Sequence, residues 1–559
     1  MSKSASESLN SSMSSLDLID YLHSLTSQAL EKLKFPSDTF RIERCKSPEL
    51  GDYSTNAALA TSKSAGKPPM ELAEEIKSAM MPDEMICADI AVSAPGFVNF
   101  SIAPAYLQNQ IPGILSAGDD YGRSDRGTGQ TALVEFVSAN PTGPLTVGHG
   151  RQAVLGDTVS SILEWHGYDV TREYYFNDAG RQMRLLGESV FARYLEILGE
   201  KVKLPEGGYE GEYIRDIAQD IFSLHGDSLK ESSEDPIFKE LAEETIFSHI
   251  RKTLRSTGIE MKSYVNEKSF YDDGSTESVV TALREQGLAY DADGAVWFKT
   301  SELGKDQDTV LIKSSGEPTY RLPDMAYHCR KVERGYDLIV DIFGADHQDT
   351  YPDVLAGVEK LGNKIDHIRV LIHQFVTLKS AGEKVKMSTR KAEYVTLQEL
   401  LDSVGVDVVR YFFIMRGMQS HLNFDLELAM KESDENPVYY LQYGHARICN
   451  IIKFGEETGT VSTDDPDLSL LSTPSELKLL KEIIRFPETA QTALETLEPQ
   501  VIANYMQEVA TNFHRFYSEC RVVTDDAALT TARLALVSAT RVVLANGLRI
   551  LGISQPVRM

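Results

Sequence analysis

The spacing of apolar positions along this chain changes several times, and the changes divide it into stretches with different expected structures. Residues 16–33 place apolar side chains on one face of a helix, and mixed elements follow. Residues 94–100 form a Pro-Gly turn that leads into an apolar strand. Residues 1–117 are therefore predicted to form a small α+β module.

A strand, a turn and a helix follow one another after a polar, glycine-rich linker. Residues 131–136 predict a buried strand, and residues 150–166 return to helical spacing. Apolar runs at residues 337–343 and 368–372 predict further core strands. Such units build a parallel sheet that binds ligands at the carboxyl ends of its strands, so a Rossmann-like domain is expected over residues 118–375.

The remaining stretches are mainly helical in pattern. Residues 184–299 carry long polar amphipathic runs and then a strand-like run at residues 295–298, and they indicate a helical insertion that splits the sheet in sequence. Residues 433–559 have helical spacing almost throughout and predict an all-α bundle, to which residues 376–432 connect the sheet domain. The expected fold class is therefore multidomain α/β: a Rossmann-like parallel-sheet domain with a helical insertion, an N-terminal α+β module and an all-α C-terminal bundle.

Composition narrows the class of protein. The 559 residues, 42% hydrophobic and 25% charged, suit a folded protein of several domains. A formal charge of −27 counts against a protein that coats nucleic acid without specificity, although it says little about any one surface. The five cysteines form no CxxC pair, so neither zinc nor a disulfide framework is expected. Because the N-terminus lacks a signal pattern and no stretch approaches membrane-spanning length, we expect a cytoplasmic protein without membrane contact.

The first residues that carry chemistry lie in the turn between the first core strand and its helix. Residues 140–151 have the sequence NPTGPLTVGHGR, in which Gly143, Gly148 and Gly150 permit close backbone approach. A helix N-terminus with free N–H groups suits a phosphate, and His149 could donate to the same nucleotide. The alternative is a Gly-Pro turn with a surface histidine.

A basic loop follows the last predicted core strand. Residues 382–391 have the sequence GEKVKMSTRK and place Lys384, Lys386, Arg390 and Lys391 close together. Cations on such a loop could neutralise the charge that develops on a triphosphate as pyrophosphate leaves. For an isolated basic run, a solvated charged hairpin is the simpler interpretation.

Together, these two segments resemble the HIGH and KMSKS motifs of class I aminoacyl-tRNA synthetases, and the surrounding sequence resembles the arginyl-tRNA synthetases. The segments that carry the resemblance are residues 51–56, 134–145, 174–182, 344–347, 436–448, 515–522 and 551–553. It implies an arginine–tRNA ligase that uses ATP and Mg²⁺ but no zinc. It also implies a monomer that binds tRNA(Arg) and L-arginine rather than DNA, and that activates arginine only when tRNA is bound.

The resemblance implies an amino-acid pocket. A guanidinium is planar and always charged, so a selective pocket needs carboxylates and other acceptors around its donors. Without the resemblance, Asp324 would be interpreted as an N-cap or turn residue and Glu135 as a surface carboxylate. The implied pocket residues are Glu135, Ser138, Asn140, Tyr320 and Asp324.

The resemblance also implies nucleotide contacts, with His149 and Lys386 as catalytic residues. Val376 would contact ATP through its backbone, and Gln348 is a weaker candidate. Taken alone, His347 would be an ordinary loop histidine. The implied ATP-binding residues are Gly148, His149, His347, Val376, Lys386, Met387 and Ser388.

Two positions depart from the family pattern. Thr146 stands where the first histidine of HIGH is expected, so the phosphate contact must weaken, pass to the hydroxyl or go through water. Thr389 stands where KMSKS has its second lysine, which leaves Lys386 and a neighbour such as Arg390 to carry the charge.

The C-terminal bundle resembles an anticodon-binding domain, and by the same resemblance the N-terminal module touches the outer corner of the tRNA. Aromatic side chains that stack on splayed bases, beside arginines that meet phosphates, suit a single-stranded loop. Tyr440, Tyr443 and Phe516 could instead pack between helices. The expected tRNA contacts are Tyr440, Tyr443, Arg447, Arg515 and Arg521.

Three rival hypotheses make different predictions. An inactive relative that only binds tRNA or protein should have lost several pocket residues together, whereas this chain retains them. Another ATP-dependent nucleotidyl transferase would leave the C-terminal helices unexplained. A synthetase for another amino acid is disfavoured by Glu135 and Asp324 within arginyl-type sequence. No editing domain is expected, because a pocket for a guanidinium fork leaves carboxylate oxygens unpaired around lysine.

Overall fold

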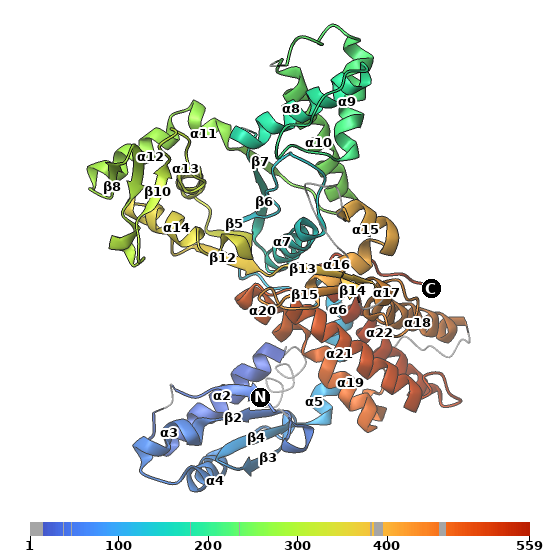
Figure 1. The fold of residues 1–559 in the computed structure, drawn as a ribbon. Helices are drawn as coiled ribbons and strands as arrows, with labels where there is room; N and C mark the ends of the chain where they lie inside the picture. Colours follow the sequence, from blue (N-terminus) through green and yellow to red (C-terminus); the bar gives the residue numbers. More distant parts are fainter. Residues whose placement is uncertain are drawn as a thin grey trace.

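A five-stranded parallel sheet is the centre of the computed structural model (Figure 1), which describes residues 15–36, 39–45, 47–178, 180–233, 235–380, 383–384, 395–457 and 466–559. The strand order is β12-β11-β5-β6-β7, and each neighbouring pair is parallel. Leu133, Val134 and Ile339 are completely buried in it, as the apolar runs predict. The strands are β5 (Thr131–Glu135), β6 (Asp169–Phe176), β7 (Ser263–Asn266), β11 (Leu338–Gly344) and β12 (Ile368–His373).

The order of the strands reverses between β5 and β11. From β5 the chain passes through α7 (Val147–Trp165) to β6 on one side, and it returns much later to β11 on the other. In open parallel sheets, ligands bind at this reversal, outside the carboxyl ends of the strands. Helix α7 can approach the sheet closely because residue 156 is glycine: a Cβ there would lie 2.1 Å from the Phe136 side chain.

The stretch expected as a helical insertion, residues 184–299, contains the strand predicted at residues 295–298, which is β9, and also β7 and β8, which the sequence did not predict. Its helices come first, and β7 then returns to the core sheet beside β6. Because β7 is a short edge strand whose four residues are all half-buried, it gives no apolar run in the sequence. A three-stranded antiparallel sheet, β10-β9-β8, follows. The elements from β6 to β12, apart from the core strands, are α8 (Gly180–Ile197), α9 (Glu212–His225), α10 (Ile237–Ser256), α11 (Lys268–Asp272), α12 (Ser275–Glu285), β8 (Ala289–Ala292), β9 (Ala295–Phe298), β10 (Thr309–Ile312), α13 (Arg321–Glu333) and α14 (Tyr351–Lys360).

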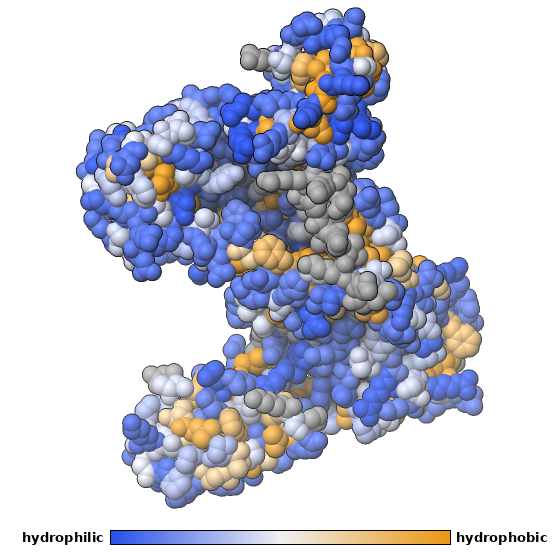
Figure 2. Space-filling model, in the orientation of Figure 1, coloured by the Kyte–Doolittle hydropathy of each residue, from blue (hydrophilic) through white to orange (hydrophobic). Residues whose placement is uncertain are grey.

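The N-terminal module has an antiparallel sheet with the order β1-β2-β4-β3, covered by helices. It contacts the C-terminal helices through ion pairs, Arg44 to Glu488 at 3.1 Å and Lys481 to Asp52 at 2.6 Å. Figure 2 shows an open notch between this module, at the lower left, and the sheet domain above it. The elements are α2 (Ser15–Lys32), β1 (Ile42–Arg44), β2 (Tyr53–Thr55), α3 (Ala57–Ala65), α4 (Pro69–Ala79), β3 (Cys87–Ser93), β4 (Phe97–Ile102), α5 (Pro104–Gln108) and α6 (Ile111–Ala117).

The region after β12 is helical apart from a small sheet with the order β14-β13-β15. Helices α18, α21 and α22 pack against one another and form the body of the C-terminal bundle (Figure 1). The elements are β13 (Val376–Ser380), β14 (Glu383–Lys384), α15 (Leu397–Val404), α16 (Val406–Ile414), β15 (Leu422–Asp425), α17 (Leu426–Ala429), α18 (Pro437–Glu457), α19 (Pro474–Ile484), α20 (Phe486–Thr496), α21 (Gln500–Glu519) and α22 (Ala527–Ile550).

Helix α22 corrects one expectation from the sequence. With 24 residues and a mean hydropathy of 1.4, it is the one helix in the described part of the chain that is long and apolar enough to cross a membrane. The expectation that no stretch approaches this length is therefore wrong. The helix is apolar because it packs in the bundle, where 56% of its most apolar segment is buried.

Candidate active site

The start of α7 carries a capping arrangement that fixes His149. Thr146 is the N-cap, and its hydroxyl accepts a hydrogen bond from the backbone N–H of His149 at 3.4 Å. The Nδ1 atom of His149 accepts in return from the backbone N–H of Thr146 at 3.2 Å. Because Nδ1 accepts, the ring of a neutral His149 carries its proton on Nε2. Burial lowers the pKa of His149 to about 4, so the ring is neutral at pH 7.

This arrangement gives Thr146 a role that the family pattern did not suggest. Its hydroxyl and backbone hold the second histidine of the motif at the helix start, where N–H groups are free to meet an anion. Gly148, in the same turn, is exposed. The turn therefore offers N–H donors together with one oriented imidazole.

The segment that follows the basic loop is anchored at the same turn. The backbone N–H of Leu397 donates to the carbonyl of Leu145 at 2.8 Å, and Thr396 bridges to Thr146. Gly150 permits this contact, since a Cβ there would lie 2.5 Å from the Leu397 side chain. The loop residues expected to bind ATP, Lys386, Met387 and Ser388, lie outside the described residues, as do Thr389 and Arg390.

A tight turn after β5 positions the next expected residues. Val137 and Ser138 both have positive φ, 70° and 41°, which is rare for residues other than glycine and costly for a β-branched one. The Ser138 hydroxyl donates to Glu135 Oε1 at 2.8 Å and accepts from the Tyr175 N–H at 3.2 Å. Glu135 is 2% exposed, so the alternative of a surface carboxylate is wrong.

Asn140 is fixed in the same turn by contacts with the end of β6 and the start of α8. Its side-chain amide donates to Gln182 Oε1 at 2.9 Å, and its Oδ1 accepts from the Asn177 N–H at 3.0 Å. The Tyr174 hydroxyl donates to the carbonyl of Ala139 at 2.7 Å. These bonds hold the strained turn in one conformation.

Asp324 lies opposite this turn, in the first turn of α13. Tyr320 is the N-cap of the helix, so the interpretation of Asp324 as an N-cap is wrong. Among the described residues, the Asp324 carboxylate has no hydrogen-bond partner, and burial raises its pKa to about 6 even though His328 favours the charged form. The Tyr320 side chain is 65% exposed at the mouth of the site.

Glu267 is a further carboxylate of the site, beside Asp324, and the sequence did not predict it. It follows β7, is 4% exposed, and accepts from the Tyr175 hydroxyl at 2.9 Å and the Asn177 amide at 2.6 Å. Burial raises its pKa to about 7, and the charge of Asp324 adds to the effect. Asp178, 7% exposed, leaves its Oδ1 without a partner nearby. The site is therefore acidic and short of cations, which suits a permanently charged ligand.

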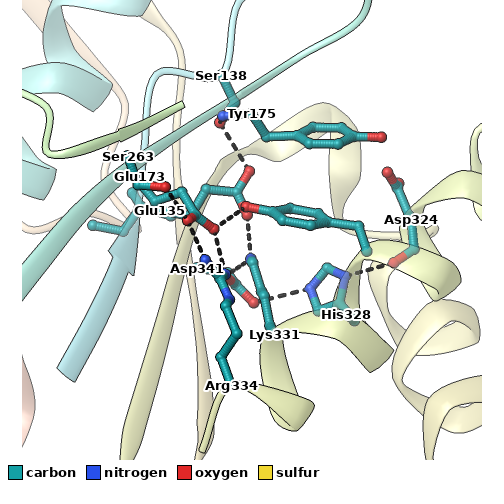
Figure 3. A network of polar contacts seen from close by, with 12 residues as sticks. Glu135, Ser138, Glu173, Tyr175, Ser263, Asp324, His328, Lys331, Arg334 and Asp341 are labelled. Atoms are coloured by element: carbon teal, nitrogen blue, oxygen red, sulfur yellow. Dashed lines mark hydrogen bonds and ion pairs between the residues drawn. The ribbon is translucent and has the colours of Figure 1, made fainter. Parts of the chain in front are cut away.

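Figure 3 shows a buried ionic network beneath the site. Lys331 of α13 donates to Glu135 and, at 2.5 Å, to Asp341 of β11. Arg334, the residue that caps the C-terminus of α13, donates two hydrogen bonds of 2.6 and 2.7 Å to Glu173 of β6. Since α13 also carries Asp324, one helix contributes both to the site and to the network below it.

The expected nucleotide residues gather on the β11 side. His347 follows β11, and its ring stacks on Phe343 with centroids 5.2 Å apart. Val376 begins β13 and is buried. His373, which the sequence analysis did not single out, ends β12 with its Nε2 atom buried and unpartnered, and burial lowers its pKa to about 4. A charge on the His149 ring would lower the pKa of His373 further, so the two imidazoles are neighbours.

The C-terminal helices present an aromatic and cationic surface. Arg447 lies over the rings of Tyr443 and Tyr517, at 4.6 and 4.8 Å, and Tyr443 stacks with His514 at 6.1 Å. A cavity of about 530 Å³ is lined by Tyr443, Arg447, Tyr517 and Arg521 among others. Three of the expected tRNA contacts, Tyr443, Arg447 and Arg521, thus lie together.

The other candidates on this surface differ from one another. Tyr440 packs on His514 with centroids 4.4 Å apart and lines a neighbouring cavity. Arg515 is exposed and paired with Glu519 at 3.0 Å, and it lines neither cavity. Phe516 is completely buried, so its interpretation as a packing residue is confirmed.

Family models match three consecutive parts of the chain. The N-terminal domain of arginyl tRNA synthetases matches residues 20–102, and the catalytic domain of class I (R) tRNA synthetases matches residues 110–409. The DALR anticodon binding domain matches residues 441–559.

Relatives and solved structures agree with these matches. Arginine–tRNA ligases from Salinibacter ruber and Chlorobium phaeobacteroides are each 47% identical to the chain, over 97% of it and all of the relative. A Campylobacter jejuni structure assigned as an arginyl tRNA synthetase is similar with a TM-score of 0.74 and 33% identity, covering 82% of this chain and 100% of that one. The Thermus thermophilus arginyl-tRNA synthetase has the same fold, with a TM-score of 0.74 at 21% identity, covering 97% of this chain and 100% of that one.

Proposed function

The chain belongs to the arginyl-tRNA synthetase family, the class I arginine–tRNA ligases, and on that premise we propose how its own residues divide the work. The ligase activates L-arginine with ATP to arginyl-adenylate, releasing pyrophosphate, and transfers arginine to the 3′ end of tRNA(Arg). The observation that carries the division of roles is an acidic pocket, between the end of β5 and the first turn of α13, beside a helix start whose N–H groups suit a phosphate.

Arginine binds with its guanidinium toward Asp324 and Glu267. Glu267 is 4% exposed and Asp324 is half-buried, and the cations of the ionic network, Lys331 and Arg334, are paired with other carboxylates. A guanidinium supplies the missing charge and enough donors to satisfy both groups, whereas the single ammonium of lysine leaves acceptors unpaired. Ser138 and Asn140 take the α-amino end, with Glu135 behind them, and Tyr320 closes the mouth.

ATP binds across the start of α7. The Nε2–H of His149 and the free N–H groups near Gly148 donate to the phosphates, while His347 and the Val376 backbone hold the adenosine. The carboxylate of arginine then attacks the α-phosphorus in line, so that positioning and charge stabilisation do most of the catalytic work. Lys386, Met387 and Ser388 complete the phosphate site by analogy with the family motif.

Mg²⁺ accompanies ATP in this proposal. In the described part of the chain, no group of three or more His, Cys, Asp or Glu side chains is placed to hold a metal. The ion would be held by the phosphate oxygens of ATP.

tRNA(Arg) spans the chain from its N-terminal module to its C-terminal bundle. Tyr443, Arg447 and Arg521 form the surface for unstacked anticodon bases, with Tyr440 and Arg515 at its margins. We also propose that the protein is a cytoplasmic monomer. Its domains would be an N-terminal tRNA-contacting domain at residues 1–117, the Rossmann-like catalytic domain at residues 118–375, the KMSKS-loop and stem-contact region at residues 376–432 and the anticodon-binding domain at residues 433–559.

The direct test is ATP-dependent charging of unfractionated tRNA with each standard amino acid in turn. Only arginine should be esterified, and Asp324→Ala should abolish the reaction. Asp366→Ala, an exposed aspartate in the same domain, is the matched control and should charge normally. Charging of another amino acid, or full activity of Asp324→Ala, would contradict the proposal.

A further inference from the structure

Three carboxylates stand in a row across the middle of the parallel sheet. Asp341 of β11 pairs with Glu135 of β5, and Glu135 pairs with Glu173 of β6. All three are at most 2% exposed. Neighbouring strands are about 4.8 Å apart, and like charges at directly opposed positions repel. The row therefore needs cations at a fixed place.

Helix α13 and its C-cap residue supply those cations. Lys331, fully buried, donates to both Glu135 and Asp341 and lies 4.3 Å from the centre of the Tyr327 ring. Burial opposes its charge, but the two carboxylates outweigh burial, so the pKa of Lys331 is raised. Arg334 holds Glu173 at the other end of the row.

Lys331 shares its face of α13 with Asp324. The two residues are seven positions apart, which is two helical turns, and His328 lies between them. One ring nitrogen of His328 contacts the Asp324 carbonyl at 2.8 Å and the other contacts Asp341 at 3.0 Å. The ion pair between Lys331 and Glu135 thus sets the distance of the Asp324 turn from β5 (Figure 3).

Glu135 passes this constraint on to the turn after β5. Its Oε2 atom accepts from Lys331 and its Oε1 atom accepts from the Ser138 hydroxyl. Val137 and Ser138 keep their positive φ angles only if the surroundings hold them, and the bond to Glu135 is one of the restraints. The Lys331 ammonium is therefore linked to both sides of the arginine pocket: to the Val137–Ser138 turn through Glu135, and to Asp324 through helix α13.

From this geometry, and resting on the proposed function, we propose that Lys331 is a positioning residue for arginine: through Glu135 it fixes the Val137–Ser138 turn at a set distance from Asp324. Lys331 does not touch the substrate. It acts on how the two walls of the pocket face each other.

The test compares Lys331→Met with Arg334→Met in steady-state arginylation by the full chain. Both variants remove one cation from the carboxylate row, so both should lower the melting temperature. Lys331→Met should raise the KM for arginine about tenfold or more, because a misplacement of roughly 1 Å in a site can cost about 100-fold. The KM values for ATP and tRNA should stay close to those of the parent. Arg334→Met should leave all three KM values unchanged.

An unchanged arginine KM in Lys331→Met, or an equal rise in Arg334→Met, would overturn the proposal. If Lys331→Met does not fold, Lys331→Met/Asp341→Asn removes one buried carboxylate together with the cation. This double variant should fold and still show the raised arginine KM, and a parental KM would again overturn the proposal. A parent chain that charges no arginine would instead contradict the proposed function itself.

Discussion

The arginine pocket and the aromatic surface on α18 and α21 both gather charged and ring side chains, but the pocket buries them and the surface leaves them accessible. In the pocket, Glu267 is 4% exposed, and its neighbours belong to several elements of the sheet domain. On the surface, Tyr517 is 37% exposed, and its neighbours Tyr443 and Arg447 belong to α18. Few hydrogen bonds fix these rings in place.

The two regions are expected to serve different purposes, because the pocket selects the amino acid and the aromatic surface contributes affinity for tRNA. An uncompensated buried charge is costly, so the pocket is expected to accept a guanidinium and reject most else. Stacking on exposed rings tolerates any base, so the surface is expected to contribute affinity in increments. Substitutions should therefore have steep effects in the pocket and graded effects on the surface.

The largest effect is expected from Asp324→Asn. The substitution leaves the guanidinium with one uncharged partner, which costs about 3–5 kcal/mol, or roughly 150- to 4,000-fold in kcat/KM for arginine. Initial rates of arginylation over a range of arginine concentrations measure it. Asp366→Asn should be indistinguishable from the parent. A loss of kcat/KM below tenfold in Asp324→Asn would contradict the steep effect expected for the pocket.

His149→Ala should lower kcat by about 10²-fold, the typical result of removing one donor to developing charge. The arginine KM should change little, because His149 lies on the nucleotide side. Thr146→Val, which keeps the backbone N–H but removes the capping hydroxyl, should have a smaller effect in the same direction. A change confined to the arginine KM would show that His149 acts on arginine and not on ATP, and would contradict this placement.

Tyr443→Ala should raise the KM for tRNA about 5- to 100-fold, the equivalent of 1–3 kcal/mol for a lost stacking partner. The KM values for arginine and ATP should be unchanged. Arg515→Ala is the matched surface control, since Arg515 is already paired with Glu519 and lines neither cavity. An equal effect of the two substitutions would remove the aromatic surface as a distinct region.

A smaller, pH-dependent effect is expected from Glu267. Its pKa of about 7 lies above the ordinary value of 4.5, so the empty folded protein holds this proton more tightly than the unfolded chain does. The contribution of Glu267 to stability is therefore present below pH 4.5 and is lost as pH rises through 7. Because a guanidinium needs the charged carboxylate, kcat/KM for arginine should rise several-fold between about pH 6 and 8. Glu267→Gln should flatten that part of the profile, and an unaltered slope would exclude the group.

The sequence predicted the sheet strands best where both faces are buried, as at β5 and β11, because such strands are continuous apolar runs. It missed β7, whose half-buried residues give no such run, and with it Glu267. His373 was missed because a lone histidine at a strand end has no local signature. Lys331 also has no local signature in the sequence, since only the fold shows that carboxylates from two strands face it.

For the motif residues, the sequence predicted the position in the fold but not the contacts. Spacing indicated that His149 lies at a helix start, and the structure adds that Thr146 orients its ring. The expected tRNA contacts could not be ranked from sequence, since Tyr443 and Arg515 stand in equally helical patterns. Their different surroundings follow from how α18 and α21 pack.

We expect the negative charge of Asp324 in the pocket to select the guanidinium of arginine. The most direct test is the ratio of kcat/KM for L-arginine to that for L-citrulline, its uncharged analogue of similar shape, in the parent and in Asp324→Asn. The ratio should favour arginine by at least about 10³-fold in the parent. In Asp324→Asn the ratio should be smaller by at least about tenfold. An equal ratio in the two proteins would mean that shape, not the buried carboxylate, selects the substrate.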